Sequence, residues 1–472
     1  MTTSLLHRAA FVAVACATLA LAGSATFDDA RAAGAPLAIG LDDNLQQVAA
    51  TPQDAGVRRS RYIGIDFSNL RGRGQRQMLR EPGLTLELFP DVTIFASFER
   101  YDTIPNGMTW VGRVEGDPMS TVTLVYRGTM MTGSIVTSGA VYQIRPAPEN
   151  IRNAGLQAGR VSHLVTQIDQ EALPREADPI EVRLTNAQLA AAADTPMGDT
   201  ADVIDVMVVY TALAAADAGG TTAIGNLINL AVSEANTSYA NSGIAQRLRL
   251  VHTAQVPYTE TGNFSTVLND LRAGVGGLSG VAALRDQHGA DMVQMFIHPT
   301  SPSACGIAFI MTNPSTAFAS SAFSVTDTDC VSPNYTFAHE LGHNMGARHD
   351  WYMDSGTTPF TYAHGHVNPA VGQRWRTIMA YPDMCGALGF SCTRLLYWAN
   401  PEKRFLPACD SGRFNCNQLQ YWFYPGAPMG IPGGTSTSCP SGNPNNANCD
   451  ADDRRALNNT AISVANFRQS VK

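Results

Sequence analysis

The stretch HELGHNMGARHD, residues 339 to 350, concentrates groups that can bind and use a metal ion. It carries three histidines at offsets of zero, four and ten, although the chain of 472 residues has only ten histidines. Residues four apart share one face of a helix, so His339 and His343 are expected to point the same way. Gly346 can adopt a backbone conformation that ends the helix and brings His349 back to the same ion. Three neutral imidazoles leave a tetrahedral Zn²⁺ one open position for water, which is the catalytic arrangement.

The residues around these histidines predict a helix and a proton acceptor. NYTFAHELGHNMGA has the composition of a helix, for which Asn334 is the expected N-cap. Glu340 follows the first histidine, so its carboxylate can take a proton from a water on the ion and pass it to a leaving amine. A surface helix with scattered histidines is the alternative. A short HExxH arises often by chance, but the extended HExxHxxGxxH is far rarer, so one catalytic Zn²⁺ is predicted.

A second motif extends the resemblance to a known class of protease. TIMAYP, residues 377 to 382, follows His349 by about thirty residues. Together the two motifs resemble the metzincins. The resemblance implies that Met379 forms an apolar floor beneath the zinc site. It also implies that Tyr381 stabilises the transition state, as in the astacin and serralysin branches. Asp350 is typical instead of the reprolysin branch, which lacks that tyrosine, so the match to any one of those branches is mixed.

Several blocks are more similar to the bacterial peptidyl-Asp metalloendopeptidases. They are AHELGHNMGARHD, YAHGHV, RTIMAYP, CTRLLYWANP and the terminal LNNTAISVANFR. The resemblance implies an α/β (α+β) metzincin-like catalytic domain, with a mixed sheet and a zinc-binding active-site helix, preceded by a signal and a propeptide. It implies a secreted zinc endopeptidase that cuts protein or peptide substrates on the amino side of aspartate. Residues 405 to 450 depart from the pattern and read as a disulfide-tied insertion, either a surface loop or a rim that shapes substrate access.

A preference for aspartate calls for a guanidinium partner, because two parallel hydrogen bonds fix a carboxylate. In metzincins the segment before the Met-containing turn helps wall the pocket for the residue after the cut. We therefore predict Arg376, and after it Arg374, as substrate-binding residues. Arg348 and Arg394 compete with them. For each of these four, a surface arginine paired with a nearby carboxylate is the alternative.

The N-terminus and the cysteines both indicate export. Residues 1 to 33 read as a signal peptide, because basic His7 and Arg8 precede an apolar run that is shorter than the ~20 residues of a spanning helix. A membrane anchor is the alternative. Apart from Cys16, which lies in the apolar run, the eight cysteines all lie between residues 305 and 449 and predict disulfides. Short loops close at low entropic cost, so we expect the pairs 305–330, 385–392, 409–416 and 439–449.

Two further units follow the signal. Residues 34 to 199 alternate apolar and polar residues and predict a β-rich propeptide that inhibits the enzyme. Its expected strands are LTLELF, VTIFASFER, STVTLVY and AVYQIRP, followed by a short alanine-rich helix and an exposed linker. Beyond the signal this unit has no cysteine, so His163 or Asp169 is the candidate to plug the site, and activation would cut near residues 194 to 202. Residues 200 to 472 alternate strands and helices and predict the α/β catalytic domain.

Composition narrows the remaining possibilities. A net charge of −8 without a basic tract argues against nucleic-acid binding, and no segment beyond the signal is apolar enough for a membrane span. His364 and His366 have strand-like spacing, which favours a structural or substrate-lining role over a second metal. Calcium stays open but has no defined ligand loop. Two other functions remain: a secreted protease of broad specificity, and a binding or adhesion protein on a protease-like scaffold. The intact Glu340 and Tyr381 argue against the second.

Overall fold

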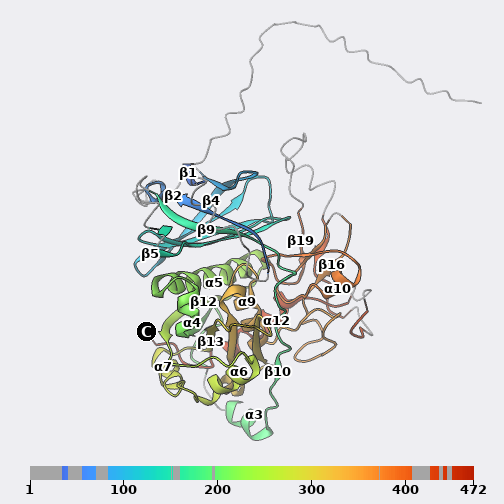
Figure 1. Cartoon of the computed structure of the whole chain (residues 1–472). Helices are drawn as coiled ribbons and strands as arrows, with labels where there is room; N and C mark the ends of the chain where they lie inside the picture. Colours follow the sequence, from blue (N-terminus) through green and yellow to red (C-terminus); the bar gives the residue numbers. More distant parts are fainter. Residues whose placement is uncertain are drawn as a thin grey trace, which may run out of the picture.

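The computed structural model describes most of the chain. The described residues are 35–40, 56–70, 83–149, 151–152, 160–193, 197–371, 373–406, 426–434, 439–443 and 449–471. The expected signal peptide, the expected disulfide between residues 409 and 416 and much of the expected insertion therefore lie outside the described residues. Figure 1 shows a β-barrel above a larger α/β region; from the barrel the chain runs down past that region to α3 (Asn186–Ala193) at the bottom of the view.

The N-terminal unit is a closed barrel of nine strands in the order β1-β2-β9-β8-β7-β6-β5-β4-β3. Antiparallel hairpins build most of it, and parallel pairing of β1 with β3 closes it. Alternating side chains fill the interior with an apolar core that includes Trp110, Leu86 and Leu124. The four strands expected from the alternation are confirmed. The strands are β1 (Ala35–Gly40), β2 (Val57–Ile65), β3 (Leu84–Phe89), β4 (Val92–Ile104), β5 (Gly107–Val114), β6 (Thr121–Arg127), β7 (Met130–Val136), β8 (Val141–Pro146) and β9 (Val161–Ile168).

The C-terminal unit is a mixed α/β region, as the alternation of strands and helices predicted. Its six-stranded sheet has the order β10-β14-β15-β13-β11-β12, and the pairing of β14 with β15 is antiparallel. The inner strands β11, β13, β14 and β15 are almost entirely buried, as is typical of strands covered on both faces of a sheet. The strands are β10 (Ile180–Glu181), β11 (Val203–Tyr210), β12 (Arg247–Gln255), β13 (Met292–Ile297), β14 (Gly306–Ile310) and β15 (Phe323–Asp327). The helices among them are α4 (Ala212–Asp217), α5 (Thr221–Ser242), α6 (Phe264–Ala273), α7 (Val281–His288), α8 (Thr328–Val331) and α9 (Thr336–Asn344).

The barrel rests on α5 (Figure 1). Val125, Val136 and Val141 of the barrel belong to the same buried apolar cluster as α5 and the sheet. Polar contacts join the same surfaces: the Arg100 guanidinium donates to Thr237 Oγ1 at 2.9 Å, and other side chains of α5 bond barrel residues. The barrel interior keeps its own apolar core, while these three valines join the barrel to the core of the α/β region.

The chain between the two units lies along the sheet. After β9 it passes the α/β region, and β10 pairs in parallel with β14, Ile180 opposite Phe309. The short helix expected after it is confirmed as α3. The pairing of β10 was not expected, because a two-residue strand held through its backbone leaves no periodic pattern in its side chains.

The C-terminal third wraps around the end of the sheet. Among the described residues, short strands and the helices α10 and α12 lead the chain back to the core. Three expected disulfides are confirmed: Cys305–Cys330, Cys385–Cys392 and Cys439–Cys449. Among the described residues no helix is both long and apolar enough to cross a bilayer. The elements are β16 (Val367–Asn368), β17 (Trp375–Arg376), α10 (Asp383–Ala387), β18 (Thr393–Arg394), β19 (Asn400–Arg404), β20 (Pro428–Met429) and α12 (Asp453–Val464).

Candidate metal centre

Helix α9 carries the first two histidines, as expected, but its start differs from the prediction. The residue before the helix is Tyr335, which adopts a left-handed conformation at φ 63° and makes no side-chain cap bond. Asn334 does not cap the helix, so that prediction is wrong. Its side-chain amide donates to Glu176 at 3.3 Å and to Thr336 at 3.2 Å instead. The amide nitrogen is turned to these partners, and Oδ1, the atom that a cap would use, has no hydrogen-bond partner among the described residues.

A tight turn follows α9 and brings the third histidine back. Gly346 has φ +92°, a conformation that side chains resist. A Cβ on Gly346 would also lie 2.8 Å from the Pro359 ring. The turn is closed by Gly346 N–H donating to His343 O at 2.9 Å. The expected role of this glycine is thus confirmed.

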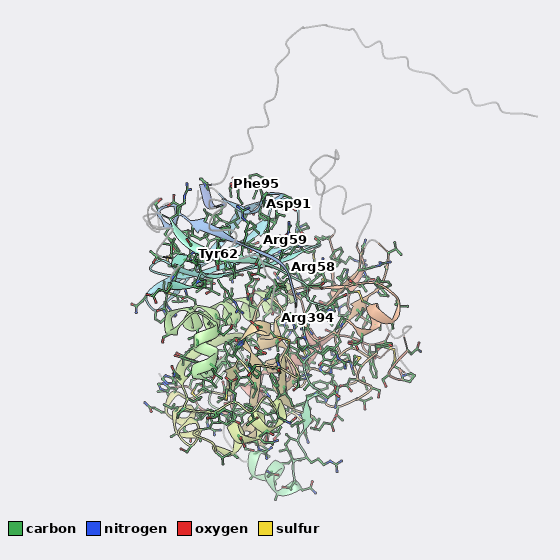
Figure 2. All side chains as sticks on the ribbon, in the orientation of Figure 1. Arg58, Arg59, Tyr62, Asp91, Phe95 and Arg394 are labelled. Carbon is green, nitrogen blue, oxygen red and sulfur yellow. A yellow bond between two sulfur atoms is a disulfide. The ribbon has the colours of Figure 1, made fainter. Side chains whose placement is uncertain are left out.

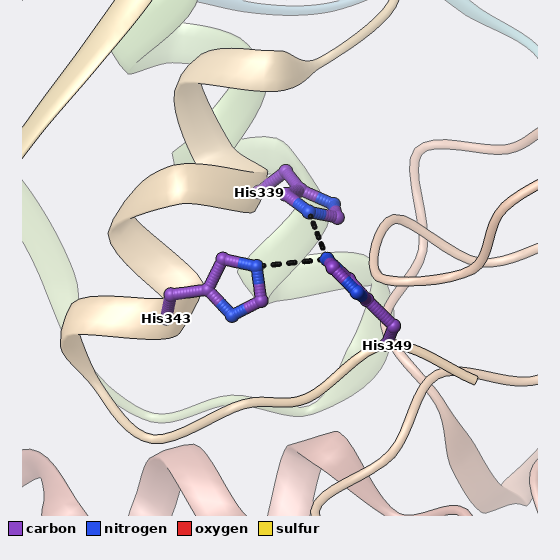
Figure 3. Close-up of side chains that lie close together, drawn as sticks. All are labelled: His339, His343 and His349. Atoms are coloured by element: carbon purple, nitrogen blue, oxygen red, sulfur yellow. Dashed lines mark hydrogen bonds between the residues drawn. The ribbon is translucent and has the colours of Figure 1, made fainter. Parts of the chain in front are cut away.

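The three histidines converge on one point (Figure 3). Nε2 of His349 lies 3.2 Å from Nε2 of His339 and 3.0 Å from Nε2 of His343. The Nδ1 atoms of His339 and His343 face the carbonyl oxygens of Ile378 and Ala347 at 2.9 and 2.8 Å. Each Nδ1 therefore carries the proton, and each Nε2 keeps a lone pair that points at His349. Lone pairs gathered this closely fit a shared cation.

The charge state of the three rings also fits a metal. All three are buried, and burial lowers the pKa of His339 to about 4 and those of His343 and His349 well below their usual value. The rings are therefore neutral near pH 7, as metal ligands must be. Three buried, neutral histidines whose ligand atoms lie within 4.8 Å of one another match the donor set of a catalytic Zn²⁺.

Glu340 lies beside this cluster with an unused carboxylate. The residue is fully buried, and neither carboxylate oxygen has a hydrogen-bond partner among the described residues. Burial raises its pKa well above the usual value. The side chain has room because Gly306 of β14 has no Cβ, which would lie 2.6 Å from Glu340 Oε1. A buried carboxylate of this kind needs a water or cation partner, and the histidine cluster is where such a partner would sit.

The segment around Met379 packs against α9 and against the ring of His349. Met379 is fully buried, and a Cβ on Gly342 of α9 would lie 2.9 Å from its sulfur. The Tyr381 ring lies 4.2 Å from the His349 ring, centroid to centroid. Its hydroxyl donates to the main-chain oxygen of Glu176 at 2.8 Å. Burial raises the pKa of Tyr381 well above its usual value, so the phenol keeps its proton.

The arginines predicted to read a carboxylate occupy different environments. Arg374 is exposed and stacks on Phe390 at 3.9 Å. Arg376 is buried, and its guanidinium donates to the carbonyl oxygens of Cys392 and Ala380 at 3.2 and 2.8 Å. Within the described part of the chain neither forms an ion pair. Arg376 is held by backbone groups, so it braces the turn after Met379.

The two competing arginines do hold carboxylates. Arg348 pairs with Asp354 at 2.8 Å and with Glu181 at 2.7 Å. Arg394 lies in the interior below the barrel (Figure 2), and its two Nη atoms lie 2.6 and 3.2 Å from the two oxygens of Glu176. Burial alone would raise the pKa of Glu176, but the Arg394 guanidinium outweighs it and holds that pKa well below its usual range.

Sequence reasoning missed Glu176. The acidic stretch after Pro174 was its only signal, and nothing in that stretch indicates a partner more than 150 residues away. The predicted plugs are wrong. His163 is buried in the barrel, where it bonds the Met131 N–H at 3.0 Å. Asp169 pairs with Arg58 at 3.0 Å. Neither contacts the histidine cluster.

The second pair of histidines is structural, as favoured from its spacing. His364 Nδ1 bonds the main-chain oxygen of His349 at 2.7 Å, and its ring stacks on Trp351. His366 packs its ring against Trp375. Among the described residues, neither belongs to a cluster with the spacing of metal ligands.

Comparison with known proteins agrees with this geometry. Residues 200–391 match the family described as Reprolysin_5, Metallo-peptidase family M12. A peptidyl-Asp metalloendopeptidase of Stenotrophomonas maltophilia (strain R551-3) is 30% identical over 453 residues, 91% of each chain. One of Xanthomonas campestris pv. campestris is 34% identical over 360 residues, 75% of this chain and 71% of the relative. Among solved structures, metalloproteinase-II of Bacteroides fragilis aligns with a TM-score of 0.36 and 14% identity over 58% of this chain and 82% of that chain.

Proposed function

This chain belongs to the peptidyl-Asp metalloendopeptidase family, and from that premise we propose that it cuts proteins and peptides on the amino side of aspartate. It is a zinc metalloendopeptidase. The observation that carries the assignment is the convergence of three neutral histidines beside the buried, unpartnered carboxylate of Glu340. Burying an unpaired carboxylate destabilises the fold, and a non-catalytic scaffold would gain nothing from it.

We assign one Zn²⁺ to His339, His343 and His349. When bound there, zinc supplies Lewis-acid chemistry, activating a water and polarising the peptide carbonyl. The fixed Nδ1 hydrogen bonds of His339 and His343 orient the rings for this task. Met379 packs under the same helix and keeps it in place.

Glu340 and Tyr381 carry the remaining steps. As the water oxygen bonds to the carbonyl carbon, the Glu340 carboxylate accepts a proton from that water. It then passes the proton to the amide nitrogen, and the carbon–nitrogen bond breaks to release the amine. The Tyr381 hydroxyl, which now donates to a main-chain oxygen, would donate to the developing oxyanion.

We assign residues 34 to 199 as the propeptide and residues 200 to 472 as the mature enzyme. The support is that the segment preceding β10 crosses the site, where Tyr381 bonds Glu176, and that the barrel covers α5. With the expected signal at residues 1 to 33 and the disulfides, this organisation supports a secreted zymogen. The site residues, the boundaries and the inhibitory role belong to this proposal.

Cleavage-site profiling tests the function. A denatured protein mixture is digested with the matured enzyme, with and without a zinc chelator, and the new N-termini are sequenced. We expect N-termini that begin mostly with aspartate and disappear with the chelator. Varied residues that still disappear with chelator would leave a protease of broad specificity. If the zinc-loaded, processed protein cleaves nothing, that result would favour the alternative of a non-catalytic binding protein.

A Glu340→Gln variant tests the mechanism. It should lose turnover, because the amide cannot accept the proton, while it keeps zinc. Glu260→Gln is a matched control, since that carboxylate bonds Thr211 and His298 N–H elsewhere in the region. Unchanged turnover in Glu340→Gln would contradict the assigned role.

A further inference from the structure

The Glu176 carboxylate is held by four donors that all come from the α/β region. Arg394 contributes two at 2.6 and 3.2 Å, the Thr336 hydroxyl donates at 2.8 Å and the Asn334 amide at 3.3 Å. The Arg394 and Glu176 side chains are only 1% and 2% exposed. Three residues distant in sequence from the carboxylate thus form a closed receptor for it.

The receptor is built to stay in place without Glu176. Arg394 also donates to the main-chain oxygens of Asn334 at 2.9 Å and Ala380 at 3.2 Å. These bonds fix the guanidinium whether or not a carboxylate is present. If Glu176 leaves, a buried cation remains without its counter-charge, which is costly until another carboxylate enters. Such a site selects ligands with an acidic side chain.

The receptor lies next to the candidate metal centre. Thr336 lies one turn of α9 before His339, and Ala380 lies between Met379 and Tyr381. An acidic side chain held here places its own main chain beside the metal ligands, and Tyr381 does bond the Glu176 main-chain oxygen.

The chain around Glu176 binds as an extended peptide. The Cys305 N–H donates to Arg175 O at 2.9 Å, and the Ala177 N–H donates to Gly306 O at 2.8 Å. Backbone bonds along β14 together with one acidic side chain in a receptor are the contacts that hold a peptide by strand addition. Glu176 therefore occupies the position that a substrate side chain would need.

We propose that Arg394, Thr336 and Asn334 form the receptor for the acidic side chain of a substrate, and that Glu176 fills this receptor in the full-length chain. The proposal has a substrate half, which is recognition of the substrate's acidic side chain, and a latency half, which is occupation of the receptor by Glu176. The substrate half rests on the proposed preference for aspartate. The same guanidinium then serves both specificity and latency. Arg374 and Arg376 have no such role, because one is exposed and the other is committed to backbone carbonyls.

The substrate half is tested with two peptides that differ only in Asp or Asn after the cut. Arg394→Gln is made in a Glu176→Gln chain, so that no carboxylate is left buried and unpaired, and Glu176→Gln/Arg374→Gln is the matched control. All are processed by tagged wild-type enzyme, which is then removed. The Asp/Asn ratio of kcat/KM should fall at least about thirtyfold in the Arg394 variant, as expected when a buried bidentate pair loses one partner. It should stay unchanged in the control.

The outcomes separate the two proposals. If the parent prefers Asp and the Arg394 variant keeps that preference, the receptor assignment is overturned while the proposed function stands. If the parent Glu176→Gln chain cuts both peptides equally, the proposed preference for aspartate is contradicted, and so is the substrate half of this proposal. If the Arg394 variant does not accumulate as folded protein, Thr336→Val removes one donor without changing charge. A smaller fall in the ratio supports the receptor, and no fall overturns it.

The latency half is tested in the full-length chain by following the disappearance of the intact protein on gels. Glu176→Gln should be processed at least about tenfold faster than wild type, because the segment loses its charged anchor. Glu181→Gln makes the same chemical change in the same segment, at a side chain that is 57% exposed and pairs with Arg348. It should be processed at the wild-type rate. Wild-type processing of Glu176→Gln, or equal acceleration in both variants, would overturn this half.

Discussion

The histidine cluster and the carboxylate receptor lie side by side but are built in different ways. The cluster comes from one stretch of twelve residues, and its geometry is set by α9 and the turn at Gly346. The receptor joins Asn334, Thr336 and Arg394, and its positive charge is balanced only while Glu176 of the N-terminal segment fills it. The cluster should therefore persist when the barrel is removed, whereas the receptor must change partner. Metal affinity therefore depends on α9 and its turn, whereas regulation depends on the contact between the receptor and the N-terminal segment.

Removing a metal ligand should give the largest effect. His343→Ala leaves two imidazoles, so zinc should be lost. Activity should then fall about a thousandfold or more, since several kcal/mol of transition-state stabilisation go with the ion. Zinc content by atomic emission and turnover of an Asp peptide measure both. His366→Ala is the control, because that ring packs on Trp375 away from the cluster. Full zinc occupancy in His343→Ala would contradict the assignment.

Breaking the receptor from one side should destabilise the full-length chain without removing zinc. Arg394→Met leaves the Glu176 carboxylate buried and unpaired, which costs about 3–5 kcal/mol of unfolding free energy. Adding Glu176→Met should recover most of that loss, because both charges are then gone. Urea unfolding of the wild type, the two single variants and the double variant gives the coupling energy. Additive losses would show that the two groups do not interact.

A smaller loss of stability is expected when a methyl group is added to α9 at Gly342, next to Met379. In Gly342→Ala the new Cβ would lie 2.7 Å from the Trp398 ring and 2.9 Å from the Met379 sulfur. Such overpacking costs about 1–3 kcal/mol of unfolding free energy. Gly386→Ala, where a Cβ would meet nothing within 4 Å, is the control. Equal stability of the two variants by urea unfolding would argue against close packing of Met379 on α9.

The smallest effect should depend on pH and lie away from the metal centre. Asp327, whose carboxylate lies 3.6 Å from His298 Nδ1, raises the pKa of His298 to about 9 against the lowering effect of burial, with help from Asp217 and Asp329. A raised pKa in the folded state means that protonated His298 stabilises the fold fully below its ordinary value of 6.5 and loses this effect as the pH rises through about 9.

The measurement is the difference in unfolding free energy between wild type and His298→Gln across pH. This difference should be largest below pH 6.5 and vanish above about pH 9. His288→Gln serves as the control, because that ring stacks on His252 rather than facing carboxylates. A difference that grows with pH would contradict the assignment.

Sequence alone predicted what depends on nearby residues. The spacing of His339, His343 and His349 follows from the periodicity of a helix and one glycine turn. The barrel strands follow from a period of two. The bond from Asn334 to Glu176, the pairing of β10 with β14 and the pairing of Glu176 with Arg394 depend on where distant segments meet. No local pattern encodes those meetings, so the wrong cap, the wrong plugs and the missed Glu176 share one physical cause.

The apolar contact between the barrel and α5 has a consequence for how activity would begin. Cutting the linker near residues 194 to 202 breaks one covalent bond but leaves Val125, Val136 and Val141 buried against the α/β region. The cut turns a contact within one molecule into an ordinary complex of two. A tether holds its ends at an effective concentration near the millimolar range, and after the cut only the real concentration counts. We therefore expect the cut protein to stay inactive at high protein concentration and to become active on dilution, when the two fragments dissociate.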